Sequence, residues 1–191
     1  MKIKTLLSTA ALLMAATTAS AGVTTHHANL VPEGTGGRTG TGFVSATFND
    51  TTNVLAFSAT FSGLSGASTV AHFHCCTALP FPATAGVAVD SPSLPIPTGV
   101  FAGTFGAELD LDDADNFSPA FVTGSGGTTA GAITRFVQGL NTGQVYFNVH
   151  SRAFPGGEIR GTMLVPEPAS AALVLLGLGG LVVMRRQAHR R

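Results

Sequence analysis

Residues 55–61 read Leu-Ala-Phe-Ser-Ala-Thr-Phe, and this stretch decides the fold class. Its apolar residues stand at every second position, at Leu55, Phe57, Ala59 and Phe61. Successive side chains of a β-strand point to opposite faces, so this alternation predicts a strand with one buried face. Further candidate strands lie on both sides of it, at residues 24–30, 39–48, 69–75, 85–89, 99–105, 144–150 and 158–164. We therefore expect a chain built mostly from short strands.

Helical periodicity is confined to residues 128–140. There Ile133, Phe136 and Leu140 follow the i, i+3, i+7 spacing of an apolar helix face. The segment 79–97 contains five prolines, so we expect it to be largely irregular. Many short strands with Gly-rich turns and one short helical excursion predict an all-β domain, either a sandwich or a barrel.

The N-terminal end has the three parts of a secretory signal peptide. Lys2 and Lys4 form a charged start, an apolar stretch covers residues 6–16, and small residues follow at 19–21. This order of charged, apolar and small residues is typical of a segment that directs export and is then removed. We therefore assign residues 1–21 to a signal peptide.

The C-terminal end, residues 166–191, reads as a membrane segment with its flanks. It contains a Pro-Glu-Pro motif, an apolar run and an arginine pair, at Pro166, Glu167 and Pro168, at residues 169–184, and at Arg185 and Arg186. A helix of that length is about 24 Å long against a hydrocarbon core of about 30 Å, and arginines that reach the interface can make up the difference. The alternative, a buried core helix, is disfavoured because the run has no polar face. We expect a transmembrane helix with an Arg-rich cytoplasmic tail and the domain outside.

Between these ends, residues 22–165 form one candidate domain, which is long enough to bury a core of its own. It contains four arginines, no lysine and nine acidic residues, so its net charge is −5. Nucleic-acid binding depends on Lys and Arg side chains that neutralise phosphates. The composition therefore argues against nucleic acid as a partner.

Three histidines form the candidate functional site. His72 and His74 are two residues apart in one predicted strand and share a face, and His150 lies in another predicted strand. If these strands are neighbours, three imidazoles converge, and neutral imidazoles suit copper and zinc. Four further residues are candidates to surround or orient the histidines: Tyr146, Asn148, Glu158 and Arg160.

The same residues also fit a structural polar cluster. The histidines would then hydrogen-bond to each other, to Asn148 and to a Glu158–Arg160 pair. Catalysis is disfavoured, because the sequence has neither a Gly-x-Ser-x-Gly nucleophile elbow nor a His-Glu-x-x-His helix. Two interpretations stay open, a structural cluster and a metal site, and copper is the first ion that we expect in the second.

Cys75 and Cys76 are adjacent and are the only cysteines in the chain. Neighbouring Cα atoms are about 3.8 Å apart, below the usual disulfide range of about 4.4–6.8 Å. Three outcomes stay open: a vicinal disulfide, bridges to another chain, or free thiols. As thiolates, the two cysteines would be further candidate metal ligands beside His72 and His74.

At three motifs the sequence resembles the CHRD domain, a module first described in chordin and also found in exported bacterial proteins. Residues 71–74 hold the paired histidines, and residues 143–151 are similar to Gly-x-x-Tyr-x-Asn-x-His-Thr, with Ser151 in place of the last threonine. Residues 154–161 are similar to the closing Pro-x-Gly-Glu-Ile-Arg-Gly. The resemblance covers residues 24–164. It implies an immunoglobulin-like or superoxide-dismutase-like β fold, and it carries over no catalytic residue.

The C-terminal end resembles the PEP-CTERM sorting signal of bacteria, in its Pro-Glu-Pro motif, short span and arginine cluster. The resemblance implies an exosortase as partner, cleavage near residues 166–168, and arrival at the cell surface or in the extracellular matrix. We expect a non-enzymatic domain that binds a surface or matrix polymer or protein. The alternative is an extracytoplasmic copper or zinc protein, or a redox protein, that uses the three histidines.

Overall fold

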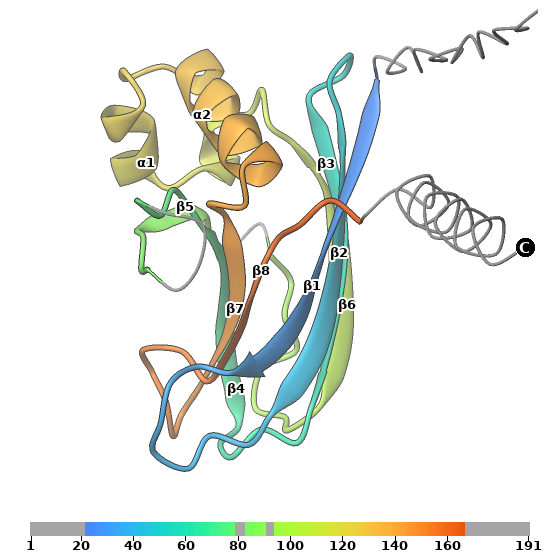
Figure 1. Ribbon diagram of the computed structural model, residues 1–191, viewed down its shortest axis with the longest axis vertical. Coiled ribbons are helices and arrows are strands. Elements are labelled where there is room, and N and C mark those ends of the chain that lie inside the picture. Colours follow the sequence, from blue (N-terminus) through green and yellow to red (C-terminus); the bar gives the residue numbers. More distant parts are fainter. Residues whose placement is uncertain (1–21, 79–82, 91–93, 167–191) are drawn as a thin grey trace, which may run out of the picture.

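The computed structural model describes residues 22–78, 83–90 and 94–166 (Figure 1). The predicted signal peptide and transmembrane helix lie outside these residues, as do Glu167, Pro168, Arg185 and Arg186 of the predicted sorting signal. Pro166 is described and exposed. Within the described part of the chain, no helix is long and apolar enough to cross a membrane.

The described residues form eight strands and three helical segments. The strands are β1 (Val23–Pro32), β2 (Thr41–Asn49), β3 (Val54–Ser62), β4 (Ser68–His74), β5 (Val87–Val89), β6 (Gly103–Asp110), β7 (Tyr146–Ser151) and β8 (Ile159–Thr162). The helical segments are the 3₁₀ helix η1 (Ala114–Asn116) and the α-helices α1 (Pro119–Gly124) and α2 (Thr129–Asn141).

All eight strands belong to one sheet, in the order β5-β4-β7-β8-β1-β2-β3-β6, and every pairing is antiparallel. The sheet curls into a half-barrel, so that β3 lies across the core from β4 and β7 (Figure 1). Phe57 of β3 packs against Phe73 of β4 and Phe147 of β7, with ring centroids 5.6 and 6.3 Å apart. The predicted all-β class is confirmed.

β8 joins the two halves of the curled sheet. It pairs with β7 on one side, and on the other it pairs with β1 at Val31↔Arg160 and Pro32↔Ile159. Just beyond β8, His27 and Leu164 exchange two backbone hydrogen bonds of 2.8 and 2.9 Å. The first and last strands of the domain are therefore neighbours.

The stretch at residues 55–61 forms most of β3, and its alternating apolar residues are the ones that are buried. Leu55, Phe57, Ala59 and Phe61 are at most 5% exposed and face the core. Their neighbours in β3 face outward. Phe57 also packs edge-on against Phe105 of β6, so one strand contacts residues of three others.

One predicted strand is displaced. The sequence predicts a strand at residues 99–105, whereas β6 spans Gly103–Asp110. The carbonyl of Val100 accepts a hydrogen bond from the Ser68 amide, which places this stretch in a loop beside the start of β4. A Cβ at Gly106 would lie 2.4 Å from a backbone oxygen of β3. Glycine is thus required at this outward position of β6, while Phe105, Ala107 and Leu109 keep the period of two past the end of the predicted strand.

Two helices cover one end of the sheet (Figure 1). α2 confirms the helix predicted at residues 128–140: the Thr128 side chain accepts a hydrogen bond from the third helical amide, and Phe136 is fully buried. α1 was not predicted. Its signal is present in the sequence as Ser118 at the N-cap and Pro119 at the first helical position.

His26 is a buried titratable group on the inner face of β1. It is 1% exposed, and its Nε2 lies 3.3 Å from Oδ1 of Asn141 in α2. Burial lowers the pKa of His26 below its ordinary value. The unfolded chain therefore takes up a proton at a higher pH than the folded chain. The contribution of His26 to stability is complete above about pH 6.5 and falls as the pH drops below that value.

We expect His26→Gln to weaken this acid sensitivity, because glutamine keeps a polar partner for Asn141 and does not titrate. Between about pH 7 and pH 5, the slope of unfolding free energy against pH should become shallower by up to about 1.4 kcal/mol per pH unit, the value for one proton. Urea unfolding at several pH values measures this slope. Equal slopes in the wild type and the variant would contradict the assignment.

Candidate metal centre

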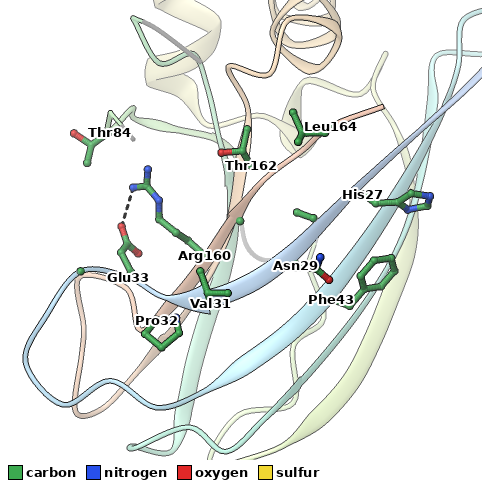
Figure 2. A pocket seen from close by; sticks show the side chains of 13 residues that line it. His27, Asn29, Val31, Pro32, Glu33, Phe43, Thr84, Arg160, Thr162 and Leu164 are labelled. Atoms are coloured by element: carbon green, nitrogen blue, oxygen red, sulfur yellow. Dashed lines mark hydrogen bonds and ion pairs between the residues drawn. The ribbon is translucent and has the colours of Figure 1, made fainter. Parts of the chain in front are cut away.

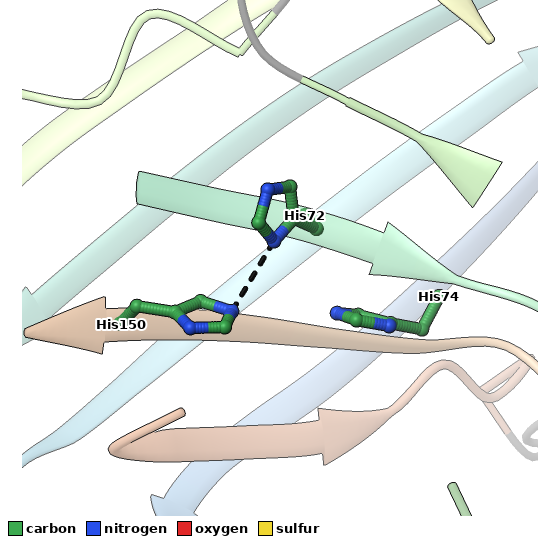
Figure 3. A group of neighbouring side chains, drawn as sticks. All are labelled: His72, His74 and His150. Atoms are coloured by element: carbon green, nitrogen blue, oxygen red, sulfur yellow. Dashed lines mark hydrogen bonds between the residues drawn. The ribbon is translucent and has the colours of Figure 1, made fainter. Parts of the chain in front are cut away.

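The three predicted histidines meet on the outer face of two neighbouring strands. β4 carries His72 and His74, and β7 carries His150 (Figure 3). In the antiparallel register His72 stands opposite Asn148, and His74 stands opposite Tyr146. The alternate residues of both strands point into the core, so packing of the inner face fixes the direction of the histidines on the outer face.

The histidine nitrogens lie close enough to share one ion. One ring nitrogen from each histidine can be chosen so that all three lie within 4.8 Å of one another. The shortest contact joins His72 Nδ1 to His150 Nε2 and is 3.2 Å long (Figure 3). His74 and His150 are each 8% exposed. The condition for this convergence, that the two histidine strands are neighbours, is met by the pairing of β4 with β7.

Each histidine uses its other nitrogen to contact an oxygen that can only accept a hydrogen bond. His72 Nε2 is 3.0 Å from Asp90 Oδ1, His74 Nδ1 is 3.0 Å from the Ala85 carbonyl, and His150 Nδ1 is 2.8 Å from the Pro155 carbonyl. These contacts fix the tautomers, because each ring must donate its proton outward. The remaining nitrogens, His72 Nδ1, His74 Nε2 and His150 Nε2, then direct lone pairs toward one another.

Burial keeps two of these rings neutral at ordinary pH. It lowers the pKa of His72 to about 4, helped by the neighbouring His150 and opposed by Asp90. Burial also lowers the pKa of His74. Neutral imidazole is the form that binds a transition-metal ion, so the environment favours the ligand state of both residues.

Three of the four predicted surrounding residues are in place. The ring of Tyr146 stacks on His74 with centroids 4.5 Å apart and planes 4° from parallel, and the Arg160 guanidinium carbon lies 4.2 Å from the centroid of the Tyr146 ring. Arg160 also forms a 3.0 Å ion pair with Glu33. Asn148 Oδ1 lies 3.1 Å from both His74 Nε2 and His150 Nε2. This packing holds His74 in one orientation.

Glu158 is in a different place from the one predicted. Its side chain is fully buried and accepts hydrogen bonds from the backbone amides of Ser65 and Gly66. Burial raises its pKa, but hydrogen bonds from Ser151, Ser65 and Gly66 lower it more, so the pKa lies below its ordinary value. Glu158 therefore stabilises the loop between β3 and β4 and does not orient a histidine.

The two cysteines form a vicinal disulfide across a cis peptide bond. Their sulfur atoms lie 3.9 and 3.6 Å from the carbonyl oxygen of Arg135 in α2, and a Cβ at Gly139 would be 2.7 Å from the Cys75 sulfur. The disulfide thus packs under α2, and it is not part of the group formed by the three histidines.

Sequence reasoning missed the groups that fix the tautomers. Two of them, at Ala85 and Pro155, are backbone carbonyls, which leave no residue-type signal in a sequence. The third is Asp90, which directly follows β5. Its signal is weak: an isolated acid at the end of an apolar run, next to a strand that pairs with β4.

We expect Asp90→Asn to weaken metal binding about 10- to 100-fold, the usual effect of removing an outer partner of a metal-bound histidine. Asparagine can still accept the proton from His72, but it loses the negative charge that strengthens the imidazole as a ligand. Competition titration against a chromophoric chelator measures the affinity. Asp113→Asn, in the turn after β6, serves as a matched control and should bind like the wild type.

A separate open groove of about 730 Å³ lies on the outer face of β8, β1 and β2 (Figure 2). Val31, Phe43 and Leu164 line it and are 54%, 42% and 43% exposed. The Phe43 ring stacks on His27 with centroids 5.5 Å apart. Arg160 lines the groove and also stacks over Tyr146, so the groove adjoins the packing around the histidines without including them.

Comparisons with known proteins agree with both resemblances. The model of the CHRD domain matches residues 20–163, and the model of the PEP-CTERM protein-sorting motif matches residues 164–191. No curated protein and no solved structure matches the chain. The first match includes every described strand and all three histidines.

Proposed function

Because the chain belongs to the CHRD domain family and ends in a PEP-CTERM sorting motif, we propose that it is an exported metal-binding protein. The sorting motif is that of a protein that leaves the cytoplasm and is processed at the membrane by an exosortase-type enzyme. We place its final location at the cell surface or in the extracellular matrix. There the β domain would hold a copper or zinc ion through His72, His74 and His150.

A single observation carries this proposal: the outer nitrogen of each ring contacts an accepting oxygen, so the three inner nitrogens direct their lone pairs toward one another. The outward contacts of the rings, to Asp90 and to two carbonyl oxygens, use one N–H of each imidazole. A purely structural cluster needs a donor in each close contact. A metal ion removes the conflict, because it accepts all three lone pairs at once.

The donor set favours copper or zinc. Imidazole nitrogens suit both ions, and the disulfide removes the thiolates that would have favoured a softer site. At an equal free concentration, copper(II) should bind more tightly than zinc, following the general order of divalent ions. We propose binding rather than catalysis. The binding of a matrix polymer or protein stays a prediction from the sequence, and the groove in Figure 2 is the surface on which to look for it.

Elemental analysis of the full chain tests the proposal. The protein is exported by its host, purified without chelator, equilibrated with copper or zinc and dialysed, beside a His72→Ala/His74→Ala variant. The wild type should retain close to one ion per chain, and the variant should retain almost none. A wild type that retains no ion after equilibration would make the histidines structural.

A further inference from the structure

We propose that Asn148 is the fourth ligand of this site, so that the ion sits in a closed shell of three imidazole nitrogens and one amide oxygen. This inference rests on the proposed function and goes beyond it. A fourth protein ligand decides whether the coordination shell of the ion keeps an exchangeable position. An ion without such a position is only bound, whereas an ion with one can bind and activate a substrate.

The distances fit a four-coordinate shell. In a tetrahedral site with bonds of about 2.0–2.1 Å, neighbouring ligand atoms are about 3.3–3.4 Å apart. Asn148 Oδ1 lies 3.1 Å from both His74 Nε2 and His150 Nε2, and His72 Nδ1 lies 3.2 Å from His150 Nε2. The amide oxygen thus lies near the spacing that a fourth vertex requires from two of the three imidazole nitrogens, and the three nitrogens lie within 4.8 Å of one another, so a small approach of the rings completes the shell.

The obvious alternative is that the Asn148 amide is turned by half a rotation, so that its NH₂ group donates to His74 and His150. This arrangement would satisfy two of the three contacts. It leaves the 3.2 Å contact between His72 Nδ1 and His150 Nε2 without a proton, because the proton of His72 is directed to Asp90. A cation satisfies all three contacts together with the amide oxygen in its present place.

The ligand atoms next to Asn148 are largely buried. Asn148 is 1% exposed, and the two histidines next to it are each 8% exposed. The carbonyls of Ala85 and Pro155 contact the outer nitrogens of those histidines, so the two loops that supply them pack against the far sides of the rings. A buried amide oxygen therefore takes the position that water or substrate occupies in a catalytic centre.

The ligands also belong to one rigid frame. Asn148 and His150 share the outer face of β7, and His72 stands directly opposite Asn148 on β4. Two adjacent strands of the same sheet thus present a His-x-His and an Asn-x-His pair. Strand pairing sets the spacing of the four ligand atoms before any ion arrives.

Cobalt(II) absorption of the full chain, with azide as a competing ligand, tests the inference. Cobalt(II) replaces the native ion as the probe, and azide enters only a shell with an exchangeable position. The proteins compared are the wild type, Asn148→Ala, Asn148→Asp and a matched control, Asn29→Ala, which removes an exposed asparagine from β1. We expect azide to leave the wild-type and control spectra unchanged and to shift the spectrum of Asn148→Ala.

The other outcomes are equally decisive. If azide shifts the wild-type spectrum as much as that of Asn148→Ala, the shell is not closed, but metal binding still holds. If the wild type binds no cobalt, copper or zinc, the proposed function itself is wrong. If Asn148→Ala fails to fold, the isosteric variant Asn148→Asp tests whether residue 148 is a ligand. Its cobalt bands should move and its zinc affinity should rise at least tenfold, because a carboxylate replaces the amide oxygen, and unchanged bands and affinity would exclude residue 148 as a ligand.

Discussion

Removal of the bound ion by a chelator should lower the melting temperature of the wild-type chain and leave that of the His72→Ala/His74→Ala variant unchanged. The folded domain gathers the ligands from two strands, β4 and β7, which the unfolded chain does not hold together. An ion that binds only the folded state stabilises it by about 4 kcal/mol when the free ion is about 1,000 times above its dissociation constant. Scanning calorimetry with and without chelator, followed by return of copper or zinc, measures the effect.

His27→Gln is the matched control for this experiment. His27 is a half-buried histidine of β1 that stacks on Phe43 in the groove, away from the three ligands. Its replacement should preserve the chelator response in full. If the chelator lowers the melting temperature of the wild type and of the double variant equally, the ion binds elsewhere. If it lowers neither melting temperature, the ion does not stabilise the folded state.

Phe57→Ala should lower the free energy of unfolding by about 3–5 kcal/mol, the usual cost of truncating a buried phenylalanine. Phe57 contacts Phe73, Phe105 and Phe147, so it connects β3 to β6 and, across the core, to the strands that carry the histidines. Its loss leaves a cavity between the two halves of the curled sheet. Urea unfolding of the chelated protein measures the change without a contribution from bound ion.

Phe43→Ala provides the comparison for this substitution. Phe43 also lies on a central strand, β2, but it is 42% exposed on the outer face. Its truncation should cost less than about 1 kcal/mol, because little buried area is lost and no closed cavity forms. Similar losses from both substitutions would contradict the assignment of Phe57 to the centre of the core.

The fold class was predictable because burial follows the period of the sequence in most strands. The alternation in β3 is a direct record of its two faces, and the helix at residues 128–140 carries its own apolar stripe. Prediction failed where the period was assigned to the wrong residues or was absent. The alternation of β6 runs through Phe105, Ala107 and Leu109, beyond residue 105 where the predicted strand ends, and the six-residue helix α1 is too short to show a period.

The site was predictable in its ligands and less so in its surroundings. His72, His74 and His150 stand out because three imidazoles on strand faces are a residue-type signal, and Tyr146, Asn148 and Arg160 lie around them as expected. A side chain's partner, however, depends on which loop folds over which strand. That is why Glu158 was assigned to the wrong neighbour and why Asp90 was missed.

The position of β8 determines when the sheet can be completed during export. This strand lies between β7 and β1, yet it is the last strand of the domain, and the Leu164 contact to His27 follows it at the residue where the sorting-motif match begins. A chain that crosses a membrane from its N-terminus therefore presents β1 and β7 with bare edges until its final strand emerges, and bare edges invite pairing with other chains. Such a chain can complete its sheet only when it has emerged as far as residue 164, where the match to the sorting motif begins. Completion of the fold and arrival of the processing signal are thus nearly simultaneous events.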